Sequence, residues 1–302
     1  MTSAQTRRQI GMFGIGHMGH GIASNLVRKG HDLGFFEHPG NQPTADLVAG
    51  GARGFTDRRA LAARSDIVIL VLTGSPQVEE VLTGAGGVLE TLRPGSLVID
   101  CSTSLPGSTA RMAAAVKAAG SRFLDAPMTR TPKEAAEGRL NLLVGGEAEV
   151  LEDARPVLAC FAENIAHVGP VGAGHGMKLV HNFVSLGMIG LLAEAAACAG
   201  HHGISPQAFV DVLAQGGGRG IALERIAPYL LTGDPSNLKF SLANARKDLA
   251  YYGDMAESAG VHREVARALL ATADAGLARA AGPAQGADGG PFVTELAGLL
   301  KP

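Results

Sequence analysis

The first half of the chain alternates short apolar runs with stretches whose apolar residues recur at helical spacing. Asp66–Leu72 (DIVILVL) is the clearest run, and its continuous apolar character predicts a strand buried on both faces of a sheet. The predicted strands are Gln9–Gly14, Asp32–Glu37, Asp66–Leu72, Ser96–Asp100, Phe123–Ala126 and Leu140–Val144. The predicted helices run from the loop after the first strand to Lys29, over Pro106–Ala119 and over Glu147–Cys160. Strands that alternate with helices predict an α/β domain with a doubly wound parallel sheet.

Beyond about Val168 the strand patterns give way to helical ones. The predicted helices are Met177–His202, Ser205–Gln215, Ile221–Leu231, Phe240–Ala259, Val261–Leu277 and Phe292–Leu300. The stretch Ala281–Pro291 is rich in Gly, Ala and Pro and is predicted to be a loop. A chain of 302 residues is long enough for two domains. We therefore expect an α/β domain over residues 1–168 and an all-helical domain over residues 169–302, which begins with a long interdomain helix.

The composition argues against several classes of protein. Charged residues make up 18% of the chain and the formal net charge is −2, whereas a nucleic-acid-binding protein needs a basic surface. The cysteines Cys101, Cys160 and Cys198 lack the spacing of a zinc site or a disulfide framework. The apolar segment Leu186–Gly200 is short for a membrane span and contains Glu194. Residues 1–9 are polar and do not resemble a secretory signal, so we expect a cytoplasmic protein without a membrane partner.

A glycine loop follows the first predicted strand and opens the first predicted helix. It consists of Gly14, Ile15, Gly16, His17, Met18 and Gly19, which have the spacing G-x-G-x-x-G. In this context the first glycine permits a tight turn, the second lets the backbone approach a pyrophosphate, and the third lets the helix pack on the strand. The loop therefore predicts a Rossmann domain that binds a dinucleotide at the helix N-terminus. His17 and His20 have no carboxylate or cysteine at ligand spacing, so no metal site is predicted.

The second predicted strand ends at Glu37, in the region where an acidic residue can bind the ribose of a dinucleotide. A carboxylate there can accept hydrogen bonds from the ribose hydroxyls of NAD and would repel the 2′-phosphate of NADP. His38 follows, where an NADP-dependent enzyme would often have an arginine. We therefore predict NAD in preference to NADP, with Glu37 and His38 in the cofactor site. Leu72 and Thr73, at the end of the third predicted strand, are predicted to contact the cofactor as well.

The segment Gly172–Asn182 combines glycines with a lysine and an amide on an otherwise apolar helix. Lys178 and Asn182 are four residues apart, so they share one face of that helix. A lysine that is buried in a pocket has a lowered pKa and can exchange a proton with a hydroxyl near neutral pH. The spacing alone allows a surface lysine at the start of a helix just as well.

Several motifs, taken in chain order, resemble those of the β-hydroxyacid dehydrogenases. This family includes 3-hydroxyisobutyrate dehydrogenase and tartronate semialdehyde reductase. The motifs are Ile10–Gly30, Asp100–Ser104 (DCSTS), Asp125–Pro127 with Gly138–Leu140 and Gly145-Gly146, Lys178 with Asn182, and Lys247–Leu249 (KDL). They span nearly the whole chain, and five motifs in register are more specific than any one of them.

The resemblance implies a role for each matching residue. Lys178 would be the general acid/base, and Asn182 would orient Lys178 or the substrate. Ser102 and Thr103 would lie near the nicotinamide and the substrate, with Thr103 in contact with both. Lys247 would reach from the helical domain to close the cleft and contact cofactor and substrate.

The substrate segment departs from the family pattern. After Asp125–Pro127 the family usually has a small apolar residue followed by Ser-Gly-Gly, whereas here Met128 is followed by Thr129, Arg130 and Thr131. The segment resembles in part the Gly-Arg-Thr of sulfolactaldehyde reductases. Because a guanidinium can form paired hydrogen bonds with an oxyanion, we expect Arg130 to bind the acidic end of a small substrate, with Thr129 and Thr131 beside it. The alternative is an arginine that points to solvent or to the cofactor phosphates.

The resemblance implies an NAD-dependent oxidoreductase that transfers a hydride between the nicotinamide and the primary alcohol or aldehyde of a small 3-hydroxy acid. An imine reductase is a related alternative, although such enzymes often lack a lysine at the position of Lys178. A non-catalytic NAD-binding interaction module is an alternative of another class, and the intact set of Lys178, Asn182 and Lys247 argues against it. In the family such long apolar helices pack between subunits, so we expect a homodimer or homotetramer.

Overall fold

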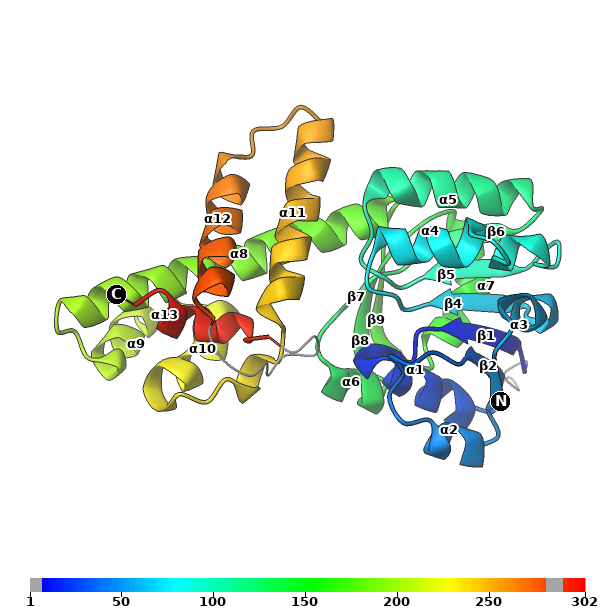
Figure 1. Ribbon diagram of the computed structural model, residues 1–302, viewed down its shortest axis with the longest axis horizontal. Coiled ribbons are helices and arrows are strands. Elements are labelled where there is room, and N and C mark those ends of the chain that lie inside the picture. The colour runs from blue at the N-terminus through cyan, green and yellow to red at the C-terminus, as the bar shows by residue number, and fades with distance from the viewer. Residues whose placement is uncertain (1–6, 281–289, 302) are drawn as a thin grey trace. The chain divides into compact units, whose positions relative to one another are not determined.

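The computed structural model describes residues 7–280 and 290–301 of the chain. The chain divides into two compact units, Met1–Lys178 and Leu179–Pro302. The first unit contains a sheet with helices on both faces, and the described part of the second unit consists of helices and their connections (Figure 1). The predicted fold class, a Rossmann domain followed by a helical domain, is confirmed.

The sheet of the first unit has nine strands within the described residues. They are β1 (Gln9–Phe13), β2 (Asp32–Phe36), β3 (Arg53–Phe55), β4 (Ile67–Leu70), β5 (Leu97–Asp100), β6 (Arg122–Asp125), β7 (Met128–Thr129), β8 (Leu140–Gly145) and β9 (Ala162–Gly169). The order is β3-β2-β1-β4-β5-β6-β8-β7, and β9 pairs with β8. Strands β1 to β6 are parallel, as predicted, but β8 is antiparallel to β6 and β7. The difference arises because the chain turns back after β6 without a long crossover helix.

Helices cover both faces of this sheet (Figure 1). They are α1 (His17–Arg28), α2 (Ala45–Ala49), α3 (Arg58–Arg64), α4 (Ser75–Thr83), α5 (Pro106–Ala118), α6 (Pro132–Glu137) and α7 (Ala148–Leu158), with a 3-10 turn η1 (Val88–Glu90). Buried residues of α1, α2, α6 and α7 form one core layer, and those of α3, α4 and α5 form the other. In β4, Ile67 and Ile69 belong to the first layer and Val68 and Leu70 to the second. The predicted burial of this strand on both faces is confirmed.

Three strands are absent from the sequence-based prediction. Strand β9 lies at an edge and most of its residues are exposed or half-buried, so it has no continuous apolar run. Strands β3 and β7 have only three and two residues, too few to establish a period. Pairing with neighbouring strands, rather than local pattern, forms these elements.

The second unit is built around the long helix α8 (Ala173–His201), whose first residues belong to the first unit. The other elements are α9 (Pro206–Ala214), α10 (Ile221–Thr232), η2 (Ser236–Leu238), α11 (Leu242–Ser258), α12 (Glu264–Arg279), η3 (Val293–Glu295) and α13 (Leu296–Leu299). By length and composition α8 would suffice to cross a membrane, with a mean hydropathy of 1.7 over an 18-residue window. However, Leu186, Ile189 and Ala193 of α8 lie in the core of the helical unit. Residues 281–289 of the predicted loop lie outside the described residues.

The predicted domain boundary at residues 168 and 169 differs from the division between the compact units. Strand β9 ends at Gly169, but the first unit continues to Lys178, inside α8. The reason is a tertiary contact at the start of the helix. The buried carboxylate of Asp125 accepts hydrogen bonds from the backbone N–H groups of Gly172 (2.8 Å) and His175 (2.9 Å). The first turns of α8 are therefore part of the α/β unit.

Candidate active site

The glycine loop after β1 has the geometry that a pyrophosphate site requires. Gly14 has a φ of +95°, and a methyl group on it would collide with the carbonyl oxygen of Val71. A methyl group on Gly19 would collide with the carbonyl oxygen of Gly14. By contrast, a methyl group on Gly16 would meet nothing within 4 Å. The backbone thus requires Gly14 and Gly19, whereas the space beside Gly16 is open to a ligand.

The N-terminus of α1 completes this cradle. Among the described residues no side chain caps α1, and its first turn contains no acidic residue. The N–H of Ile15 donates to Oδ1 of Asn41 (3.2 Å), and its carbonyl accepts from the N–H of Gln42 (2.7 Å). The loop is therefore held in position while the first amides of the helix remain available, with the positive end of the helix dipole, for an anion.

Glu37 lies directly after β2, on the strand next to β1 and at the same end of the sheet as the glycine loop. Its side chain is exposed and lies against Gly54, where an added methyl group would collide with the Glu37 carboxylate. Its N–H donates to the carbonyl of Phe55 (2.8 Å). His38 is also exposed, and its Nδ1 accepts from the N–H of Gly40 (3.0 Å). The structure thus leaves the Glu37 carboxylate accessible at the edge where a dinucleotide ribose would lie.

The loops after β4 and β5 are joined by Ser102. Its Oγ accepts from the N–H of Leu72 (3.0 Å), and its own N–H donates to Oδ1 of Asp100 (2.9 Å). Ser102 is buried, whereas Thr103 is half-buried and Thr73 is exposed. The hydroxyl of Ser102 therefore connects two loops at the cofactor edge, and Thr103 and Thr73 are accessible hydroxyl-bearing residues of these loops.

The substrate segment adopts an unusual backbone. Arg130 has a φ of +82° and is the only residue other than glycine with a positive φ in the described part of the chain. Glycine adopts this conformation without strain, whereas residues with a side chain adopt it less readily. The Arg130 guanidinium donates to the carbonyl of Arg139 and pairs with the carboxylate of Glu163. This hydrogen bond lowers the pKa of the Glu163 carboxyl.

The two threonines beside Arg130 also have partners within the protein. The Thr129 Oγ1 accepts from the amide of Asn141 (3.2 Å). The N–H and hydroxyl of Thr131 both donate to Glu134, so Thr131 caps the short helix α6. Substrate contacts of Thr129, Arg130 and Thr131 stay predictions, and the structure assigns Thr131 a capping role that the sequence analysis missed.

The half-buried Lys178 lies within α8, one turn after the buried side chain of His175. His175 is surrounded by polar groups that the sequence analysis did not assign to the site. Its Nδ1 lies 2.7 Å from Oγ1 of Thr109, and its ring lies near the carboxylates of Asp100 and Asp125. Both aspartates and the histidine occur in the motifs of the sequence analysis, but nothing in the sequence indicates that their side chains are buried.

In the second unit, Asp248 connects two of the predicted site residues. The buried amide of Asn182 donates through Nδ2 to Oδ2 of Asp248 (2.6 Å). The Nζ of Lys247 lies 3.3 Å from Oδ1 of the same carboxylate. Sequence analysis identified Asn182 and Lys247 but missed Asp248 as their common partner. Its position next to Lys247 in the KDL motif was the available signal.

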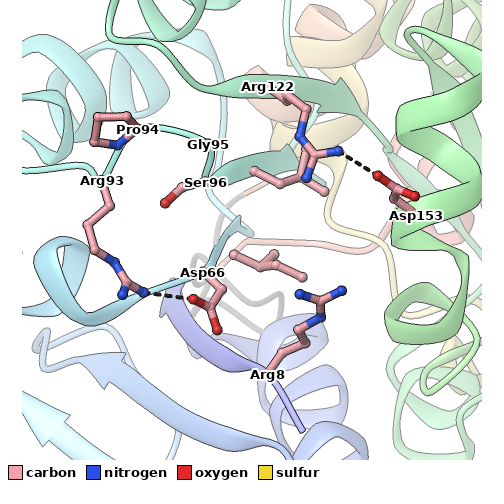
Figure 2. A pocket seen from close by; sticks show the side chains of 10 residues that line it. Arg8, Asp66, Arg93, Pro94, Gly95, Ser96, Arg122 and Asp153 are labelled. Carbon is pink, nitrogen blue, oxygen red and sulfur yellow. Dashed lines mark hydrogen bonds and ion pairs between the residues drawn. The ribbon is translucent and has the colours of Figure 1, made fainter. Parts of the chain in front are cut away.

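A cavity of about 250 Å³ lies elsewhere, at the amino ends of the strands (Figure 2). Arg8, Arg93 and Arg122 line it together with Asp66 and Asp153. Arg93 pairs with Asp66 (2.8 Å) and Arg122 with Asp153 (2.7 Å), as the dashed lines in Figure 2 show. Ligands of open α/β sheets bind at the carboxyl ends of the strands, so this cavity is not the candidate active site.

Comparison with known proteins agrees with the geometry of the glycine loop. Residues 9–169 match the family described as the NAD binding domain of 6-phosphogluconate dehydrogenase. Residues 172–288 match the family described as the NAD-binding region of NADP-dependent 3-hydroxyisobutyrate dehydrogenase. The chain belongs to the β-hydroxyacid dehydrogenase family, the group of 3-hydroxyisobutyrate dehydrogenase. The family predicted from the sequence motifs and the NAD-binding class are confirmed.

Individual relatives carry several activities. The NAD-dependent L-serine dehydrogenase of Pseudomonas aeruginosa is 37% identical, over 74% of this chain and 74% of its own. The 3-sulfolactaldehyde reductase of Escherichia coli is 34% identical, over 82% of this chain and 83% of its own. The structure of Mycobacterium tuberculosis 3-hydroxyisobutyrate dehydrogenase with L-serine matches with a TM-score of 0.86 and 28% identity, over 98% of this chain and 100% of that chain. Imine reductases match at 20% identity or below, which shows a shared fold alone.

For the three glycines of the loop, we predict that the same substitution by alanine has different effects on stability and on NADH binding. Gly16→Ala is expected to leave the melting temperature unchanged, because the added methyl group meets no protein atom, but to weaken NADH binding about tenfold or more. Gly14→Ala and Gly19→Ala are expected to lower the melting temperature, because the methyl group collides with backbone. Thermal melting and NADH fluorescence titration measure both effects. Equal NADH affinity of Gly16→Ala and wild type would contradict the pyrophosphate assignment.

Proposed function

We propose that this protein interconverts the primary alcohol of a small 3-hydroxy acid and the corresponding semialdehyde, with Lys178 as general acid/base. The coarser activity, an NAD-dependent hydroxyacid dehydrogenase or reductase, follows from membership of the family. The observation that carries the finer proposal is the position of Lys178. This lysine is half-buried in α8, just after the turn that the Asp125 carboxylate ties to the sheet.

The proposed reaction divides the work between cofactor and protein. NAD, held by the glycine loop and Glu37, supplies the hydride acceptor when it is bound. Lys178 would take the proton of the substrate hydroxyl during oxidation and return it during reduction. The chain must also hold the acidic end of the substrate, for which Arg130 and Thr129 are the proposed partners.

Asn182 and Lys247 are proposed to position the reacting groups. Their common partner Asp248 supports this role, because a buried carboxylate that accepts from the amide of Asn182 fixes the orientation of that amide. Lys247 is held near the same carboxylate by its charge. The three residues form one connected polar group in the second unit.

The accessible carboxylate of Glu37 supports a preference for NAD over NADP. A negative charge beside the ribose favours free hydroxyls and repels a 2′-phosphate. We expect kcat/KM to be higher with NAD than with NADP. Glu37→Ser is expected to reduce the ratio of these two kcat/KM values about tenfold or more. Initial rates with both cofactors test this, and a wild-type enzyme that prefers NADP would contradict it.

We also propose that the enzyme is cytoplasmic, from its cysteine usage, and homo-oligomeric. Val184, Met188 and Leu191 of α8 are 52%, 40% and 66% exposed, and they are spaced so that they lie along one side of the helix. A row of exposed apolar side chains favours contact with another subunit. Light scattering is expected to give a dimer or tetramer of the 30.8 kDa chain, and a monomer would contradict the proposal.

Turnover of a substrate panel tests the role of Lys178. The panel contains 3-hydroxyisobutyrate, L-serine and glycerate with NAD, and tartronate semialdehyde, succinic semialdehyde and sulfolactaldehyde with NADH. Lys178→Ala is expected to lower kcat by about 10²–10⁴-fold, because it removes the proton-transfer group. The change in NADH absorbance measures the rate.

Lys117→Ala, an exposed lysine on α5, is the matched control and is expected to retain wild-type turnover. NADH binding should remain intact in both variants. Wild-type turnover by Lys178→Ala would mean that another group transfers the proton.

Arg130 and Glu163 give a paired test of substrate binding. Arg130→Gly is expected to raise KM for acidic substrates about tenfold or more, because a charged hydrogen-bond partner is lost. Glu163→Gln is expected to lower KM, because the carboxylate that competes for the guanidinium is gone. If KM is unchanged in Arg130→Gly, the guanidinium stays with Glu163 and does not bind substrate.

A further inference from the structure

A buried polar cluster lies where strands β5 and β6 end and α8 begins. Asp100 and Asp125 are register partners at the ends of these two parallel strands. Their side chains are 1% and 0% exposed, and the side chain of His175 between them is 0% exposed. Burying a carboxylate costs free energy unless hydrogen bonds or opposite charges compensate for it. The presence of a histidine between two buried carboxylates therefore requires an explanation.

The hydrogen bonds of Thr109 determine how the imidazole is oriented. The Thr109 hydroxyl donates to the carbonyl of Leu105 (3.1 Å). A hydroxyl has only one proton, so while it donates to Leu105, Oγ1 of Thr109 accepts from Nδ1 of His175, 2.7 Å away. In this arrangement Nδ1 carries a hydrogen, and the opposite edge of the ring, with Nε2, is directed at Asp100.

Nε2 of His175 has an unusual environment in this cluster. It is buried and has no hydrogen-bond partner among the described residues, and it lies 3.7 Å from Oδ2 of Asp100. Oδ2 of Asp125 lies 3.9 Å from Nδ1. These separations exceed a hydrogen-bond length, so the ring lies close to both carboxylates without bonding directly to either.

Each carboxylate also holds a different backbone segment. Asp125 accepts from the N–H groups of Gly172 and His175 at the start of α8. Asp100 accepts from the N–H of Ser102, whose Oγ is bonded to the loop after β4. The imidazole of His175 is thus the group common to the start of α8 and the cofactor-side loops.

The start of α8 also packs too closely against the sheet to move freely. A methyl group on Gly174 would collide with the carbonyl oxygen of Leu143 and would lie 2.7 Å from that of Asp125. Lys178 follows His175 by three residues, about one helical turn. A shift of this turn relative to the loops would therefore move Lys178 with it.

We propose that His175 is a positioning residue for the reaction. Its side chain connects the first turn of α8 to Thr109 on α5 and to the carboxylates at the ends of β5 and β6, and this sets where Lys178 presents its amine. The inference rests on the proposed function, because it assumes that Lys178 transfers the proton. Misplacing a catalytic group by about 1 Å can cost on the order of a hundredfold in rate, whereas the glycine loop and its NADH affinity should be unaffected.

Thr109 permits a test that leaves His175 and both aspartates in place. Thr109→Val keeps the shape of the side chain but removes the acceptor of Nδ1, and Thr109→Ser keeps the hydroxyl. Thr109→Val is expected to lower kcat by about tenfold to a hundredfold, with KM and the Kd for NADH unchanged. Thr109→Ser is expected to keep kcat near that of wild type. His175→Leu, which removes the donor to Thr109, is a second variant if Thr109→Val fails to fold, and is expected to lower kcat in the same way.

Hydrogen–deuterium exchange over residues 172–182 provides a measurement that does not depend on turnover. Exchange there is expected to rise in Thr109→Val and not in Thr109→Ser. If Thr109→Val lowers the melting temperature but keeps kcat, or if exchange is unchanged, the cluster is only structural and the inference is overturned. Lys178→Ala is assayed in parallel. If it retains turnover, the proposed function has failed, and the inference fails with it for that separate reason.

Discussion

The buried carboxylate of Asp125 connects the sheet to the helix that carries the candidate catalytic lysine. It lies at the end of β6 and accepts the N–H groups of Gly172 and His175. An anion at a helix N-terminus interacts favourably with the unpaired amides and with the helix dipole, and this interaction is strong where water is excluded. Gly145 and Gly174 allow the close approach, because a side chain at either would collide with the surrounding backbone or with Asp125. The position of Lys178 depends on this tertiary cap, and the side chain of His175 in the same turn adds contacts to Thr109, Asp100 and Asp125.

The proposed cofactor edge of the first unit depends on open space beside the backbone rather than on charged side chains. Gly14 and Gly19 are required by the turn and by the contact between α1 and β1, while Gly16 leaves room beside an uncapped helix N-terminus. Neither lysine nor arginine occurs in the loop. Backbone amides are therefore the groups available there for the proposed pyrophosphate, and selectivity between ribose hydroxyls and a phosphate is the role proposed for the nearby Glu37.

The segment after β6 illustrates how a substitution changes several interactions together. Arg130 occupies a backbone conformation that favours glycine, and the ion pair with Glu163 on β9 provides a compensating interaction. Thr131 caps α6 through Glu134, so the replacement of a second family glycine has a structural explanation. The guanidinium is then shared between a structural partner and a proposed substrate anion.

The sequence by itself determined the features that depend on local pattern. The period of apolar residues identified strands β1, β2, β4, β5, β6 and β8 and the change to helices in the second half. A strand that is buried on both faces, or a helix that is buried on one face, has a recognisable spacing of apolar residues along the chain. The spacing of the glycines and the ordered motifs identified the NAD-binding class and the family.

Only the tertiary structure decided which polar groups meet. Asp100 and Thr109, Asp125, and His175 come from three separate parts of the chain and converge because β5 and β6 end at one edge, where α8 begins. Edge strand β9, the Glu163 partner of Arg130 and the Asp248 partner of Asn182 likewise depend on long-range contacts, which local pattern does not encode.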